Sequence, residues 1–294
     1  PLTFISTAYL ASYNNLKIVF ADIEEDTLNI SPEDITRKIT NKTKVIVPVH
    51  FGGHACRMDE IMKIAKDHGL YVVEDCAHAA GAEYKGRKLG TFGDMSCFSF
   101  QAVKNIATGD GGMLVTNNED LVKRAKILRW VGINKDTSER TLKDQYKWNY
   151  DITEMGYKYQ MCDILASLGI VQLKRLEKMN ARRREITKMY NHAFEDVKWI
   201  TTPVQKNYAN SSNHNYVLKI EKDREKLMNY LSQNGISTGV HYLPVYKHPI
   251  YKHINADCPV TEKIWKKLIT LPLYPDMSNS DVELVINFVK RFTG

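Results

Sequence analysis

The sequence YVVEDCAHAAGAEYKGRKLGTFGDMSCFSFQAVKNIATGDGG spans residues 71–112 and decides the expected fold. It contains two apolar runs typical of buried strands, Tyr71–Val73 and Cys97–Phe100. Asp75 follows the first run and Lys104 follows the second. Because ligands of open α/β sheets bind at the carboxyl ends of the strands, we expect Asp75 and Lys104 to belong to one site.

An amine and an acid in this order suggest a pyridoxal phosphate site, which needs a Schiff-base lysine and an acid that keeps the ring nitrogen protonated. Taken alone, Lys104 is more often a solvated lysine and Asp75 a helix cap. Ser99 and the glycine cluster of residues 109–112 flank Lys104 and supply phosphate donors, which favours the cofactor site. His78 is either an ordinary hydrogen-bonded histidine or a contact of the cofactor.

Composition excludes several other classes of protein. The net charge of +7 and the pI near 9.0 favour an acidic partner, but the basic residues are scattered and form no nucleic-acid motif. Five cysteines without CxxC spacing favour a reducing compartment and argue against a disulfide framework or a zinc site. No signal peptide and no membrane-spanning run is visible, and the glycine cluster is not a dinucleotide motif. We therefore expect a cytoplasmic protein without a metal.

The remaining patterns predict alternating strands and helices of a large domain, residues 1–195, followed by a small α+β domain, residues 196–294. In the first domain we expect strands at 17–23, 44–50 and 113–116, helices at 31–39, 58–68, 118–130 and about 162–194, and a polar loop at 134–154. In the second we expect strands at 215–220 and 238–241 and helices at 223–234 and 281–292.

Several motifs together resemble the DegT/DnrJ/EryC1/StrS family of sugar aminotransferases. They are EDCAHA, GDMSCFSFQAVKNIATGDGGMLVTN, GYKYQMCDILASLGIVQLKRLE, GVHYLPVYKHPIY and LPLYP, and they cover nearly the whole chain in order. The resemblance implies the fold of aspartate aminotransferase (fold type I), an α/β fold with a mixed central sheet and a smaller α+β domain. It also implies pyridoxal 5′-phosphate as the cofactor and a homodimer with shared active sites.

Matched position by position, the resemblance implies which residues bind the cofactor. Lys104 would carry it as a Schiff base and act as the catalytic residue, and Asp75 would pair with the pyridine nitrogen. His78 would contact the ring or its hydroxyl, Ser99 would bind the phosphate, and Phe4 would stack on the ring, although Phe4 could equally be a core aromatic.

The resemblance also implies contacts with the partner subunit and the substrate. Lys158 matches the position from which the neighbouring subunit reaches the phosphate. His241 and Tyr242 match a segment near the sugar nucleotide. Gln101 stands where several family members have histidine or tyrosine, next to the substrate. Gln160 stands where many members have arginine, so we expect the side chains that contact the sugar nucleotide to differ here.

The implied reaction moves an amino group from L-glutamate to a ketone of a nucleotide-linked deoxysugar. The short joint KNIATGDGG resembles members that aminate carbon 4, as in perosamine or 4-amino-4-deoxy-arabinose nucleotides. A carbon 3 aminotransferase and a non-catalytic scaffold of the same fold remain alternatives, whereas Lys104 argues against a dehydratase branch that carries histidine there. Family members also have a segment before PLTF with part of the phosphate site, so we expect Pro1 to lie inside a domain.

Overall fold

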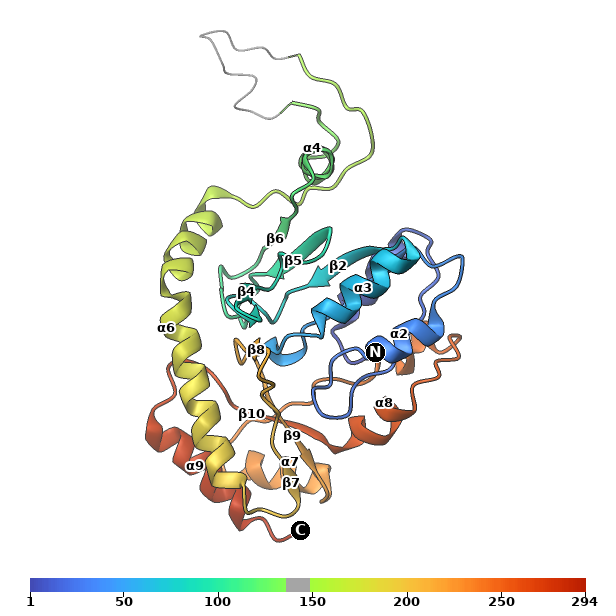
Figure 1. Ribbon diagram of the computed structural model, residues 1–294. Helices are drawn as coiled ribbons and strands as arrows, with labels where there is room; N and C mark the ends of the chain where they lie inside the picture. Colours follow the sequence, from blue (N-terminus) through green and yellow to red (C-terminus); the bar gives the residue numbers. More distant parts are fainter. Residues whose placement is uncertain (136–148) are drawn as a thin grey trace.

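The computed structural model describes residues 1–135 and 149–294 of the 294-residue chain (Figure 1). The described helices are α1 (Ile5–Tyr13), α2 (Pro32–Lys38), α3 (Met58–His68), α4 (Glu119–Arg129), α6 (Asp163–Phe194), α7 (Arg224–Gln233), α8 (Pro259–Ile264) and α9 (Asn279–Arg291). The described strands are β1 (Val45–Ile46), β2 (Tyr71–Asp75), β3 (Glu83–Tyr84), β4 (Arg87–Lys88), β5 (Met95–Ser99), β6 (Gly112–Val115), β7 (Ile200–Thr201), β8 (Ala209–Asn210), β9 (Tyr216–Ile220) and β10 (Leu268–Leu271).

The sheet that carries the expected site has the order β1-β2-β5-β6. β1, β2 and β5 are parallel and β6 is antiparallel to β5, so the sheet is mixed as predicted. Helix α3 lies against it (Figure 1) and buries Met58, Ile61 and Ala65 in the same apolar core as Val72 of β2. Their i, i+3, i+7 spacing places these three side chains on one face of the helix.

A second antiparallel sheet, in the order β10-β9-β7, lies near the carboxyl end of the chain. The carboxyl half of α6, together with α7 and α9, buries apolar side chains against it in one core. In Figure 1, α6 runs along one side of the molecule from the central sheet to this second sheet. A small sheet in the order β4-β3-β8 pairs residues 83–84 with 209–210, which fastens the two halves of the chain together.

Predicted helix starts are confirmed in detail. The Ser31 side chain accepts a hydrogen bond from the Asp34 N–H at the start of α2, and the Asn118 side chain accepts from Asp120 and Leu121 at the start of α4. These side chains satisfy N–H groups that the first turn of a helix leaves free.

Two predicted strands are wrong. Residues 17–23 form only one isolated bridge, between Ile23 and Ile30, because side chains occupy the polar backbone groups of the segment. The Lys38 ammonium donates to the Phe20 carbonyl at 2.7 Å, for example. Residues 238–241 form only the bridge Gly239–Thr270.

The strand expected at residues 44–50 is reduced to β1 and a bridge at Val49, because Pro48 cannot donate a hydrogen bond to a ladder. Of the loop expected at 134–154, residues 136–148 lie outside the described part of the chain. Ile133, directly before the expected loop, and Ile152, near its end, form an isolated antiparallel β-bridge. Among the described helices, none has both the length and the apolar character needed to cross a membrane.

Candidate active site

Two neighbouring parallel strands bring the acid and the amine to one edge of the central sheet. Asp75 is the last residue of β2 and lies opposite Cys97 of β5. β5 ends at Ser99, and a turn follows in which the Lys104 N–H donates to the Gln101 carbonyl at 2.9 Å. Lys104 therefore lies just beyond the carboxyl end of the strand next to Asp75.

Two donors fix the Asp75 carboxylate. Its Oδ2 accepts a hydrogen bond of 2.6 Å from the Thr7 hydroxyl of α1, and its Oδ1 accepts one of 3.0 Å from the Ala77 N–H. A third hydroxyl, that of Thr3, lies 2.9 Å from the Thr7 hydroxyl. Because both oxygens are held, the carboxylate has a defined direction at the end of β2.

The Lys104 amine has a lowered pKa. Burial lowers the pKa of Lys104 below its ordinary value, and the negative charge of Asp75 opposes this effect in part. A lower pKa leaves a larger fraction of the amine unprotonated near neutral pH, which imine formation requires.

His78 is almost fully buried, with 4% of its surface exposed. Its Nε2 and the Tyr242 hydroxyl form a hydrogen bond of 3.0 Å, whereas its Nδ1 is buried without a partner among the described residues. Burial, together with the charges of Lys104 and His241, holds the pKa of His78 well below its ordinary value, so the ring is neutral. A neutral ring with one unused nitrogen can still bind a polar group of a ligand.

His241 and Tyr242 lie in the same region, joined by a cis peptide bond. The Nδ1 of His241 is 2.8 Å from the Thr270 hydroxyl of β10. Burial and the charge of Lys104 lower the pKa of His241 to about 4. The segment predicted to lie near the sugar nucleotide therefore contacts His78 through Tyr242. Its His241 has a pKa that the charge of Lys104 helps to lower.

Ser99, which the resemblance predicts to bind the phosphate, is the last residue of β5 and begins the turn that leads to Lys104. The Ser99 hydroxyl accepts a 3.4 Å hydrogen bond from the Gln101 N–H, and the exposed Gln101 side chain accepts one from the Val103 N–H. Gly111 has a φ of +127°, and a Cβ there would lie 2.3 Å from Met161 Cε. Only glycine fits this position without strain.

Phe4, Lys158 and Gln160 are the remaining predicted cofactor and substrate residues. The Phe4 carbonyl accepts a 3.2 Å hydrogen bond from the N–H of Thr7, whose side chain holds Asp75. Phe4 precedes α1 and is 60% exposed. Lys158 packs its ammonium 3.3 Å from the centre of the Trp130 ring, and Gln160 is exposed. In the described part of the chain, neither Lys158 nor Gln160 forms a hydrogen bond or ring contact with the cluster around Lys104.

Sequence reasoning missed Thr7, Asn105 and His214. Thr7 and His214 lie far from residues 71–112 in the chain, and an isolated threonine or histidine gives no periodic signal. Asn105 follows Lys104 directly, and this adjacency was the one available clue. All three reach the site through hydrogen bonds that only the folded chain creates.

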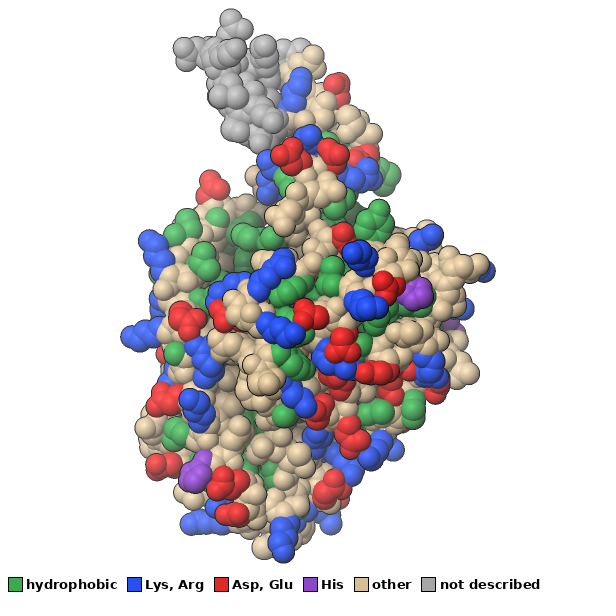
Figure 2. Space-filling view, viewed as in Figure 1, with side chains coloured by type: hydrophobic (Ala, Val, Ile, Leu, Met, Phe, Trp, Pro, Cys, Tyr) green, Lys and Arg blue, Asp and Glu red, His purple; other side chains and the backbone are tan. Residues whose placement is uncertain are grey.

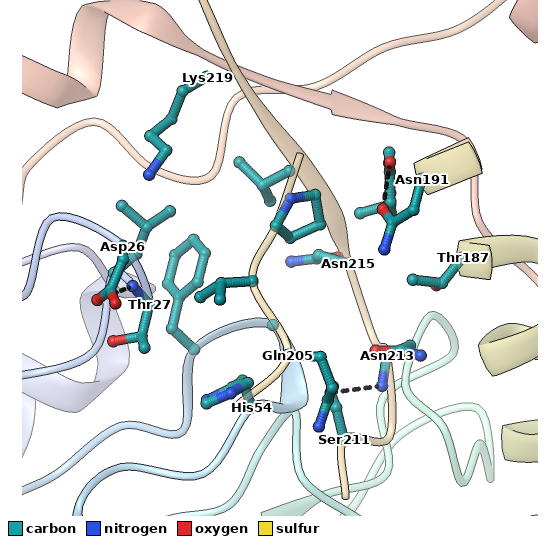
Figure 3. A pocket seen from close by; sticks show the side chains of 17 residues that line it. Asp26, Thr27, His54, Thr187, Asn191, Gln205, Ser211, Asn213, Asn215 and Lys219 are labelled. Carbon is teal, nitrogen blue, oxygen red and sulfur yellow. Dashed lines mark hydrogen bonds between the residues drawn. The ribbon is translucent and has the colours of Figure 1, made fainter. Parts of the chain in front are cut away.

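A small cavity of about 50 Å³ lies elsewhere, between α6, β9 and the turn at Phe51 (Figure 3). The Thr187 hydroxyl and the Asn215 amide nitrogen, both on its wall, are buried without partners among the described residues. A cavity of this size has room for a few water molecules, which could bind these two groups. None of the predicted site residues lines it.

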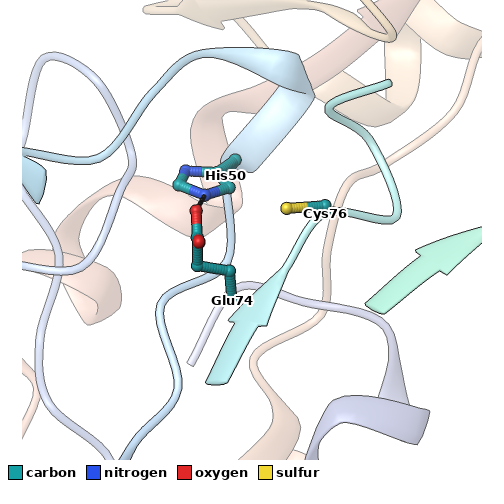
Figure 4. Close-up of side chains that lie close together, drawn as sticks. All are labelled: His50, Glu74 and Cys76. Atoms are coloured by element: carbon teal, nitrogen blue, oxygen red, sulfur yellow. Dashed lines mark hydrogen bonds and ion pairs between the residues drawn. The ribbon is translucent and has the colours of Figure 1, made fainter. Parts of the chain in front are cut away.

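His50, Glu74 and Cys76 form a buried cluster whose possible ligand atoms lie within 4.8 Å of one another (Figure 4). Glu74 already accepts hydrogen bonds from three N–H groups and from His50 Nε2 at 3.2 Å, and His50 Nδ1 accepts from the Cys56 N–H. Burial keeps the pKa of Cys76 well above its ordinary value, so its sulfur is a thiol. The cluster is therefore built as a hydrogen-bonded pair beside a thiol.

Comparison with known proteins identifies the class. The model of the DegT/DnrJ/EryC1/StrS aminotransferase family matches residues 1–290. In structure, the chain is similar to a putative sugar aminotransferase, Spr1654 of Streptococcus pneumoniae in its PMP form, with a TM-score of 0.91 and 30% identity over 98% of this chain and 79% of that one. It is also similar to Helicobacter pylori PseC, an aminotransferase of pseudoaminic acid biosynthesis, with a TM-score of 0.92 and 28% identity over 99% and 77% of the two chains.

Relatives in sequence agree. The chain is 41% identical to the spore coat polysaccharide biosynthesis protein SpsC of Bacillus subtilis over 99% of its own length and 77% of that protein. It is 46% identical to the uncharacterized protein MJ1066 of Methanocaldococcus jannaschii over 100% and 78% of the two chains. The chain belongs to the DegT/DnrJ/EryC1/StrS aminotransferase family and is a pyridoxal phosphate-dependent sugar aminotransferase.

The residues present fit this cofactor. Lys104 supplies an amine of lowered pKa, and Asp75 supplies a fixed carboxylate at the neighbouring strand end. The unpartnered Nδ1 of His78 is a buried polar atom that a ligand would satisfy.

Proposed function

We propose that the protein transfers an amino group from L-glutamate to carbon 4 of a nucleotide-linked keto-deoxysugar. The observation that carries the proposal is that Asp75, whose carboxylate is held by two donors, and Lys104, whose pKa is lowered by burial, follow the ends of two neighbouring parallel strands. The short joint between Lys104 and Gly112 supports carbon 4, because it resembles members that act there. The positive net charge of +7 suits an anionic nucleotide sugar and glutamate.

Bound pyridoxal phosphate supplies an electron sink next to the reacting carbon. Lys104 Nζ would take the proton from the α carbon of glutamate as a general base. With the keto sugar bound, it would deliver a proton as a general acid to the sugar carbon that receives the nitrogen. The Asp75 carboxylate would stabilise the positive charge of the protonated ring nitrogen of the cofactor. We assign Ser99, Phe4 and Lys158 to the phosphate and the ring, and Gln101, Gln160, His241 and Tyr242 to the substrate side.

We also propose fold type I, a boundary between residues 195 and 196, and a cytoplasmic homodimer with shared active sites. An exposed apolar surface supports the dimer. It comprises Ile164, Leu168, Ile170, Val171 and Leu173 of α6, which are 49–75% exposed. Figure 2 shows hydrophobic side chains beside the upper part of the molecule, where α6 begins in Figure 1. Ile164, Leu168 and Val171, at i, i+4 and i+7, share one face of the helix, and an apolar face exposed in this way suits a contact between subunits.

The decisive experiment combines product analysis with labelling. Full-length protein is incubated with pyridoxal phosphate, ¹⁵N-glutamate and a panel of nucleotide-linked keto sugars, and the products are analysed by mass spectrometry and NMR. We expect ¹⁵N on carbon 4 of one sugar, and borohydride to fix the cofactor on Lys104. Nitrogen on carbon 3 would reassign the position, and labelling of a different lysine would remove Lys104 from its role.

A further inference from the structure

A chain of buried side chains runs from the residue after Lys104 to the ring of His78. Asn105 is 4% exposed, and its amide nitrogen donates to Asn180 Oδ1 of α6 at 2.8 Å and to the Ser212 carbonyl at 2.9 Å. Both hydrogens of that nitrogen are therefore used. Its Oδ1 lies 2.9 Å from His214 Nδ1 and can only accept.

This geometry defines the tautomer of His214. Because Asn105 Oδ1 can only accept, His214 Nδ1 carries the hydrogen and donates it. Burial holds the pKa of His214 well below its ordinary value, and the nearby groups His78, Lys104, Arg183 and His241 act in the same direction. The His214 ring is thus neutral, with its lone pair on Nε2.

His214 in turn holds His78. The two rings stack with centroids 4.3 Å apart and planes inclined by 25°. The neighbouring Ser212 hydroxyl donates to the His78 carbonyl at 2.6 Å, so the same segment holds both the ring and the backbone of His78. The Tyr242 hydroxyl forms a hydrogen bond of 3.0 Å with His78 Nε2.

The long helix anchors this chain. Asn180 donates its own amide hydrogen to the Ala80 carbonyl at 2.9 Å, next to the segment that holds His78. Arg183, one turn further along α6, donates to the Leu273 carbonyl at 2.7 Å and to the His214 carbonyl at 3.5 Å. The long helix therefore holds both the segment after His78 and the backbone of His214.

We propose that His214 and Asn105 are positioning residues. They join the His78 ring to the backbone next to Lys104 and so fix the position of the His78 ring relative to the Lys104 amine at the cofactor. His214 acts through its Nδ1–H and its ring face and does not itself touch the reacting atoms. The inference rests on the proposed active site and adds a role for two residues that the resemblance did not assign.

Two substitutions separate the hydrogen bond from the stacking. His214→Phe keeps a ring but loses the Nδ1–H and leaves Asn105 Oδ1 buried without a donor. His214→Asn restores a donor near the position of Nδ1 but loses the ring. His253→Phe changes an exposed histidine and is the matched control.

We expect His214→Phe to lower kcat roughly 10- to 100-fold, because small displacements of reacting groups have effects of this size. We expect KM for the keto sugar to change less than about twofold, since no substrate contact is removed. His214→Asn should recover part of the lost kcat, and His253→Phe should match the wild type. Wild-type kcat in both His214 variants of an active enzyme would overturn the inference but leave the proposed function intact.

A second measurement needs neither cofactor nor turnover. In the cofactor-free wild-type protein with ¹⁵N-labelled histidine, NMR should show His214 as the neutral Nδ1–H tautomer between pH 6 and 8, assigned by its loss in His214→Phe or His214→Asn. An Nε2–H tautomer or a protonated ring at pH 7 would overturn the inference even if a variant fails to fold. An inactive wild-type enzyme with the expected tautomer would contradict the proposed function alone.

Discussion

At the scale of single residues, the site depends on a carboxylate whose two oxygens have different partners. Thr7 from α1 holds one oxygen of Asp75, and the Ala77 N–H next to β2 holds the other. The charge of Asp75 also acts on Lys104. Asp75 thus connects the first helix, the central sheet and the amine.

Replacing Asp75 by Asn should keep the shape of the side chain and remove its charge. We expect the protein to retain the cofactor, but the half-reaction with glutamate to slow by about two to four orders of magnitude, because the opposing charge of the ring nitrogen is lost. Stopped-flow absorbance measures this half-reaction. Asp67→Asn, at an exposed carboxylate paired with Lys63, is the control, and a near-normal rate in Asp75→Asn would refute the assignment.

At the scale of elements, the end of β2 presents two carboxylates in opposite directions. Successive residues of a strand point to opposite faces, so Glu74 faces the core and Asp75 faces α1. Glu74 is fully buried and accepts from the N–H groups of Gly90, Phe92 and Gly93 and from His50. It fastens the loop that precedes β5 to the end of β2.

Replacing Glu74 by Gln should place an amide N–H₂ where the Gly90 N–H and His50 now donate. We expect the free energy of unfolding to fall by about 3 kcal/mol, because buried donors would face one another. Urea unfolding measures this, with the exposed Glu283→Gln as the control. A loss below about 0.5 kcal/mol, the range of ordinary surface substitutions, would contradict this role of Glu74.

The loss of unfolding free energy in Glu74→Gln should depend on pH. Burial acts to raise the pKa of Glu74, but the hydrogen bonds from His50, Gly93 and Gly90 outweigh it, and the pKa lies below its ordinary value of 4.5. A carboxylate of lowered pKa stabilises the folded state above its unfolded pKa. The difference between wild type and Glu74→Gln should therefore be complete near neutral pH and shrink as the pH falls below 4.5.

At the scale of the whole molecule, an arm formed by α4 and residues 130–135 and 149–161 extends away from the body (Figure 1). Hydrogen bonds of the Tyr157 and Tyr159 N–H groups to the carbonyls of residues 128 and 129 hold its two sides together. Lys158 lies on this arm with its ammonium over the Trp130 ring, and among the described residues it forms no hydrogen bond or ion pair with Lys104 or Asp75. That position suits a residue that serves the site of a second subunit.

Co-expression of two inactive variants tests this arrangement. Lys104→Ala and Lys158→Ala subunits together should give about a quarter of the wild-type activity, since half of the dimers are mixed and each mixed dimer has one intact site. Lys104→Ala with Asp75→Asn is the matched control and should stay inactive, because both changes belong to one subunit's share of the site. No recovery in the first pair, or a monomer in solution, would end the proposal of shared sites.

The sequence alone was sufficient for local features with strong signals. Apolar runs predicted β2 and β5, and caps at Ser31 and Asn118 predicted two helix starts. The strand ends predicted that Asp75 and Lys104 follow neighbouring strands, and β2 and β5 are indeed paired. The same reasoning failed for residues 17–23, whose apolar pattern is that of a strand. The strand propensity of a segment does not show whether a neighbouring strand is available to it. In residues 17–23, side chains bind part of the backbone instead; the Lys38 ammonium, for example, donates to the Phe20 carbonyl.

The sequence by itself determined the family and the cofactor, because short spacings within residues 71–112 carry motifs of the family. It also predicts Lys104 as the lysine that carries the cofactor. Only the tertiary structure decided what surrounds those groups: Thr7 on Asp75, Tyr242 and His214 on His78, and Asn105 between His214 and α6. The physical reason is that these contacts join residues far apart in the chain. Hydrogen bonds and ring stacking depend on distance and direction in space, and neither is encoded in local periodicity.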